Sequence, residues 1–124
     1  TREGLGRSGT PMKGSTMTLN ELARDVHQTA VEHGFWIGGR SFGEQIALIH
    51  SEASEALEAD RAGEPLTWEP DDKPGKVNGA AGELVDVIIR CLDSLAFMDV
   101  DIDEIFKKKA EYNRSREFKN GKRY

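Results

Sequence analysis

The segment from about residue 80 to residue 98 constrains the fold most, because apolar residues surround too much of the helix it would form. Nine of its residues are apolar: Leu84, Val85, Val87, Ile88, Ile89, Cys91, Leu92, Leu95 and Ala96. At about 100° per residue they cover an arc of roughly 200°. One core-facing stripe needs less than that. We therefore expect this helix to be buried on two sides, by its own domain and by a second subunit.

Three capping boxes predict where three further helices begin. They pair Thr18 with Glu21, Ser41 with Glu44, and Asp101 with Glu104. We expect the first helix to end near Gly34, the second near Arg61 and the fourth near Phe118. Two apolar stripes support this assignment. They comprise Leu19, Leu22, Val26 and Ala30 in the first helix, and Ile46, Ile49, Ala53, Ala56 and Leu57 in the second.

Residues 63–77 contain Pro65, Pro70 and Pro74 and cannot form regular structure. A loop of this length in a small domain is often functional. No repeat and no convincing strand pattern is present. The sequence thus predicts an all-α chain of four helices, forming a helix bundle that oligomerisation completes.

Composition fits one soluble domain, with 31% charged and 37% hydrophobic residues. We place this domain at residues 17–118, between a flexible N-terminal tail (residues 1–16) and a basic C-terminal tail (residues 119–124). The net charge of −5 argues against binding to nucleic acid polymers or to membrane surfaces. Cys91 is the only cysteine, which excludes an internal disulfide and favours a cytoplasmic location.

Carboxylates recur at helical spacing on the second and third helices. Glu52 and Glu55 stand one turn apart on one face, and Glu83 and Asp86 repeat that spacing. If the two helices run antiparallel, the pairs can face each other. Four hard oxygen ligands on adjacent helices suit Mg²⁺, with Mn²⁺ as a possible substitute.

The alternative is that each pair belongs to a solvated helix face. On the third helix this alternative fits well, because the acids lie in the arc that the apolar residues leave free. On the second helix it fits less well, since Leu48 projects within the arc of Glu52 and Glu55. Glu58 projects about 120° from Glu52 and is expected to lie outside the site.

The apolar stripe of the fourth helix becomes polar without leaving its face. Lys109, Asn113 and Arg116 continue the line of Ile102, Ile105 and Phe106. Two cations and an amide on this face suit a triphosphate beside a metal cluster. Equally, the stripe can run out of the core into solvent, with basic residues favoured by the helix dipole.

With these motifs the chain resembles the MazG-like all-α nucleoside triphosphate pyrophosphohydrolases. The family signature E-x-x-E, a spacer, then E-x-x-D matches Glu52, Glu55, Glu83 and Asp86, with a spacer at the long end of the family's range. Three segments are similar in sequence to the small single-domain members: LIHSEASEALE, GELVDVIIRCLD and KKKAEYNRSREFKNGKR. The resemblance covers roughly residues 18–124. Related groups are all-α dUTPases, dCTP pyrophosphatases and phosphoribosyl-ATP pyrophosphohydrolases.

The resemblance implies an enzyme that binds Mg²⁺ through the four carboxylates. It would cleave nucleoside triphosphates between the α and β phosphates, in nucleotide-pool house-cleaning. The positions of Lys109, Asn113 and Arg116 imply contacts to phosphate or sugar, and the family implies a homo-dimer or homo-tetramer. Glu52 or Glu55 can serve as general base.

Base recognition is less defined by the sequence. Trp36, Phe35 and Trp68 are candidates for stacking on the base. For Trp36 an ordinary loop anchor is the equal alternative, and Trp68 fits the anchor better. Two other functions remain open: hydrolysis of phosphoribosyl-ATP, and a non-catalytic module for nucleotide binding or oligomerisation.

Overall fold

In a computed structural model, residues 16–124 are described, with the side chain of residue 120 left aside. All but the last residue of the predicted N-terminal tail lies outside this part. The described chain forms α1 (Leu19–Glu32), α2 (Phe42–Arg61), α3 (Ala80–Met98), α4 (Ile102–Ser115) and a short 3₁₀ helix, η2 (Phe118–Gly121). Within residues 16–124 there is no strand, so the all-α prediction is confirmed there. None of the helices in that part is long and apolar enough to cross a membrane.

Local capping sets the helix starts. In both α1 and α2 the predicted box forms in full, with Glu21 accepting from Thr18 N–H and Glu44 accepting from Ser41 N–H, each at 2.8 Å. Asp101 caps α4 by accepting from the N–H of Glu104 at 3.2 Å. The α4 helix ends at Ser115 and not near Phe118, and the chain then turns into η2.

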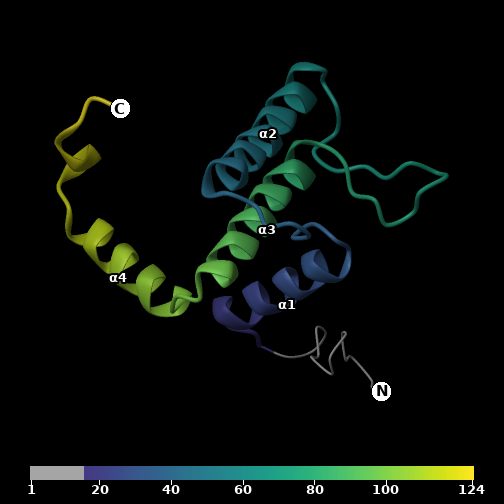
Figure 1. Ribbon diagram of the computed structural model, residues 1–124. Helices are drawn as coiled ribbons and strands as arrows, with labels where there is room; N and C mark the ends of the chain where they lie inside the picture. Colours follow the sequence, from purple (N-terminus) through teal and green to yellow (C-terminus); the bar gives the residue numbers. More distant parts are fainter. Residues whose placement is uncertain (1–15) are drawn as a thin grey trace.

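Helix α3 is the centre of the molecule, with α1 and α2 packed against it (Figure 1). Helices α2 and α3 lie side by side and run in opposite directions. The core lies between α1, α3 and the start of α4. Its members are Ala23, Leu92 and Ile102, with Leu19, Leu22, Val26, Leu95 and Ala96 packed around them. Three members of the predicted stripe of the first helix, Leu19, Leu22 and Val26, therefore face the core, whereas Ala30 lines a pocket between α1 and α3.

The predicted stripe of the second helix is partly wrong. Ala53 and Leu57 are exposed, Leu57 by 56%. The residues buried on α2 are Gln45, Glu52, Ala56 and Ala59. Because Ala56 and Ala59 are small, this face can approach α3 closely, whereas the larger Leu57 is left outside.

One side of α3 stays open in the single chain. Leu92 is buried, but Leu84, Val85, Ile88 and Ile89 are between 41% and 56% exposed. Among the described residues no large side chain is fully buried. A single copy thus covers only part of the wide apolar arc that the sequence predicts.

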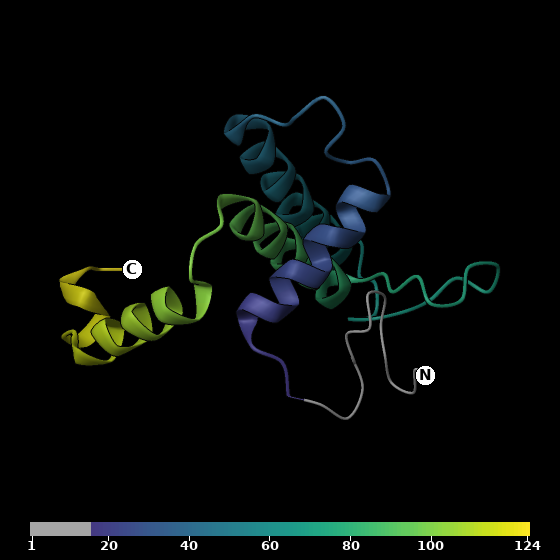
Figure 2. The same cartoon turned by 60° about the horizontal axis from the view of Figure 1, so that its bottom comes forward.

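The loop that joins α2 to α3 and the helix α4 lie at opposite ends of α3 (Figures 1 and 2). The loop is tied back at its base, because Trp68 and Asn78 exchange backbone hydrogen bonds of 3.1 and 2.7 Å. Its predicted irregular character is confirmed apart from this isolated bridge.

The first turn of α4 is bonded to the first turn of α1. The Asp103 carboxylate accepts from the N–H groups of Leu19 and Asn20, at 2.9 and 3.3 Å. In return, Asn20 Oδ1 accepts from Ile102 N–H at 2.7 Å. These bonds direct the rest of α4 away from α2 and α3 (Figure 2).

Candidate functional site

The antiparallel pairing of α2 and α3 brings three of the four predicted acids together. Glu52, Glu55 and Glu83 each offer a carboxylate oxygen, and these atoms all lie within 4.8 Å of one another. Glu52 is only 9% exposed, whereas Glu55 lies at the surface. Within this carboxylate cluster, Glu52 thus lies in the interior and Glu55 at the solvent-exposed rim.

Asp86, the fourth predicted acid, stands one turn further along α3, outside this trio. It lines a pocket together with Glu52. Burial raises the pKa of Asp86, and the charge of Glu52 raises it further. Burial likewise raises the pKa of Glu83, with the charges of Glu55 and Asp86 adding to the effect. Without a cation, the acids oppose one another's ionisation.

Glu58, the third acid of the run on α2, behaves as a surface residue. Its carboxylate lies 3.8 Å from Arg61 Nη1, and both side chains are about 70% exposed. Such a pair contributes little to stability. The expectation that Glu58 lies outside the acid cluster agrees with this placement.

Arg90 is the site residue that the sequence analysis missed. Its Nε–H donates to Glu52 Oε2 at 2.7 Å, joining α3 to α2. The signal was available in the sequence, since Arg90 follows Asp86 by four residues and precedes Asp93 by three. Residues so spaced share a helix face, and this polar line continues from Glu83 along α3.

A pocket of about 250 Å³ extends from Glu52 and Asp86 toward α1. Phe35 and Ile89 contribute apolar walls, and Arg40, Arg90 and Asp93 add polar groups to its lining. Concave sites of this kind, apolar with a few fixed polar groups, suit small organic ligands.

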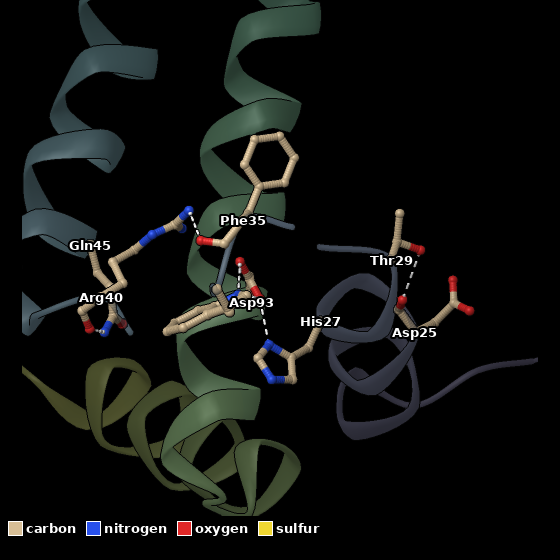
Figure 3. Close-up of polar contacts among 8 residues, drawn as sticks. Asp25, His27, Thr29, Phe35, Arg40, Gln45 and Asp93 are labelled. Carbon is tan, nitrogen blue, oxygen red and sulfur yellow. Dashed lines mark hydrogen bonds and ion pairs between the residues drawn. The ribbon is translucent and has the colours of Figure 1, made fainter. Parts of the chain in front are cut away.

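Trp36 is held by contacts within its own chain. Its indole Nε1–H donates to both oxygens of Asp93, at 3.1 and 3.2 Å. The same Asp93 carboxylate lies 2.6 Å from His27 Nδ1 (Figure 3). The indole also stacks on Phe97, with ring centres 4.4 Å apart, and the Arg40 guanidinium carbon lies 4.9 Å from its centre. Stacking of a base on Trp36 stays a prediction, whereas Phe35 lines the pocket directly.

Trp68 anchors the long loop close to the acids. Its indole N–H donates to Glu64 Oε1 at 2.8 Å. Trp68 and Asn78 line a second pocket, whose lining includes Glu55 and Glu83. The carboxylate cluster therefore has a pocket toward α1 on one side and a pocket toward the loop on the other.

The predicted phosphate-binding residues of α4 lie elsewhere in the chain. Lys109 and Asn113 line an apolar pocket with Leu95 and Phe106. The Arg116 guanidinium lies 5.4 Å from the centre of the Tyr112 ring. The two pockets described above beside the carboxylate cluster, and a third one lined by Asp86, have no α4 residue in their linings. Within one chain, the basic stripe and the carboxylate cluster are not brought together.

No protein-family model matches this chain, and no curated protein or solved structure is significantly similar to it. The assignment of function consequently depends on the acid cluster, the pockets beside it and the motif resemblance.

Proposed function

We propose that this chain is a Mg²⁺-dependent nucleotide pyrophosphohydrolase. It cleaves nucleoside or deoxynucleoside triphosphates between the α and β phosphates, giving a nucleoside monophosphate and pyrophosphate. The observation that carries the proposal is the meeting of Glu52, Glu55 and Glu83 oxygens within 4.8 Å, from two helices. Clearing non-standard or excess nucleotides is the role that fits such an enzyme.

The donor set suits a hard divalent cation. Glu52, Glu55 and Glu83 supply carboxylate oxygens, which Mg²⁺ and Mn²⁺ prefer. Asp86 completes the set from the next turn of α3. Burial, and after it the charges of the neighbouring acids, raise the pKa values of Glu83 and Asp86, and a bound cation would offset both effects. When bound, Mg²⁺ supplies charge neutralisation at the phosphate oxygens.

The protein groups have defined tasks in this reaction. Glu52 or Glu55 accepts a proton from the attacking water as its oxygen bonds to phosphorus. The bond between phosphorus and the bridging oxygen of the α and β phosphates breaks, and pyrophosphate leaves. Lys109 and Arg116 stabilise the charge that develops on the phosphates. The pocket toward α1 holds the nucleoside, with Phe35 against the base.

A homo-dimer or homo-tetramer brings these groups together. In one chain Lys109, Asn113 and Arg116 stand apart from the acids, so we propose that α4 of a second copy supplies them. The exposed apolar side chains of α3, such as Leu84 and Ile88, support an interface between copies. Small domains gain stability from such association.

A substrate panel tests the function. The folded protein is incubated with Mg²⁺ and each common, deaminated or modified nucleoside triphosphate, and with phosphoribosyl-ATP. Pyrophosphate release is then measured. We expect release from a subset of the triphosphates. If no compound is hydrolysed while nucleotides still bind, the chain is a binding module and the proposed reaction is wrong.

A further inference from the structure

Arg90 bonds to a carboxylate that the proposed metal site would use. Its Nε–H bonds to Glu52 Oε2 at 2.7 Å, which leaves one oxygen of this carboxylate unengaged by Arg90. A divalent cation held by Glu52 and a guanidinium this close would repel each other. Metal and Arg90 therefore compete for the same carboxylate.

The burial of Glu52 explains why one of the two must be present. At 9% exposure, Glu52 is almost fully removed from water, and a carboxylate in such a place needs a cationic or hydrogen-bonding partner. Removing the partner of a buried charge is strongly destabilising. Both Arg90 and a divalent cation meet this need, so an exchange between them keeps Glu52 neutralised throughout.

The Arg90 guanidinium also has unused donors. Its terminal Nη groups make no hydrogen bond to any of the residues in the described range 16–124. The side chain is 30% exposed and lines the pocket toward α1. Arginine binds phosphate oxygens through its fork of N–H groups, so an anion in this pocket is a suitable second partner.

We propose that Arg90 exchanges partners as the enzyme is loaded. In the metal-free protein it holds Glu52, and when a divalent cation takes Glu52 it turns to a phosphate oxygen of the substrate. This inference rests on the proposed function. It makes Arg90 a substrate-binding residue that also keeps the metal-free site intact.

Arginine side-chain NMR observes the exchange directly. The Nε–H signal of Arg90 is assigned by its absence in Arg90→Lys, which keeps the charge and guards against unfolding. We expect the wild-type signal to shift and to exchange faster with water on titration with Mg²⁺. Inorganic tripolyphosphate, a base-free mimic of the substrate, should then slow its exchange again. A signal that saturating Mg²⁺ leaves unmoved overturns the inference.

Calorimetry supplies a second readout. We expect Arg90→Gln to bind Mn²⁺ about tenfold more tightly than wild type in the absence of phosphate, and Mg²⁺-tripolyphosphate about tenfold more weakly. Arg61→Gln is the matched control, because Arg61 pairs with the exposed Glu58, and it should change neither value. Unchanged Mn²⁺ affinity in a folded Arg90→Gln protein contradicts the competition.

The two proposals fail differently. If wild-type protein binds no divalent cation, the proposed function itself is wrong. If it binds the metal and hydrolyses triphosphates while Arg90 stays on Glu52, only the partner exchange is wrong.

Discussion

At the scale of single residues, the acids that define the site also weaken the metal-free protein. Glu83 and Asp86 stand one turn apart on α3 and face the acids of α2. Burial and these like charges raise the pKa of both groups. As pH rises from about 4, the unfolded chain therefore loses these protons before the folded chain does. Stability falls through this window, and the loss is complete above the raised pKa values.

Glu83→Gln should therefore stabilise the metal-free protein. We expect a gain of about 0.5 kcal/mol in the free energy of unfolding at pH 7, the size of a like-charge contact on a helix. The gain should vanish below about pH 4, where the acids are protonated in both states. Urea unfolding with a chelator present measures it, with Glu58→Gln as control. A variant that is less stable than wild type at pH 7 would show that these charges do not oppose one another.

The sequence predicts the acids themselves but not all of their surroundings. Helical spacing places Glu52 with Glu55 and Glu83 with Asp86, because that relation is local. The bond from Arg90 to Glu52 crosses between helices and depends on their register, which no local pattern specifies. Trp36 shows the same limit, because it lies in the connection between α1 and α2 whereas its partner Asp93 lies on α3.

At the scale of elements, helix starts are predictable and buried faces less so. The boxes at Thr18 and Ser41 form because their partners lie three residues away. The buried face of α2 differs from the prediction because it depends on which side chains of α3 it packs against. The small residues Ala56 and Ala59 and the ion-paired Glu52 are buried, whereas the larger apolar Leu57 is exposed.

Gly79 fixes the path of the long loop into α3. Its φ is +99°, and a Cβ there would overlap the carbonyl oxygens of Pro65 and Leu66. We expect Gly79→Ala to destabilise the protein by about 3 kcal/mol, combining backbone strain with this overlap. Gly75→Ala is the matched control. Gly75 has a similar φ of +92° but open space around it, so about 1 kcal/mol is expected. Equal losses in urea unfolding would contradict a special role for Gly79.

At the scale of the whole molecule, the position of α4 relative to the acids could not be predicted from the sequence. The stripe of α4 allowed two interpretations, a basic face beside the acids or a stripe that runs out of the core into solvent. In the structure, Asp103 and Asn20 bond the first turn of α4 to α1, across more than 80 positions of the chain. Lys109 and Arg116 are thereby carried away from the carboxylate cluster of their own chain.

Mixed oligomers test whether a second copy returns α4 to the site. Glu52→Gln and Arg116→Ala should each be inactive alone. If sites are shared, co-assembly restores one intact site in each mixed dimer, about a quarter of wild-type activity for random two-fold pairing. Steady-state rates of mixtures refolded together measure this. No recovery in confirmed mixed oligomers would place each site within one chain.

The most direct test of the central claim is ³¹P NMR of the reaction on the best substrate of the panel. Wild-type protein should give nucleoside monophosphate and pyrophosphate only when Mg²⁺ is present. Glu83→Gln, although folded, should lose at least about a hundredfold in rate, whereas Glu58→Gln should stay close to wild type. Formation of nucleoside diphosphate and orthophosphate, or full activity in Glu83→Gln, would contradict a pyrophosphohydrolase built on these carboxylates.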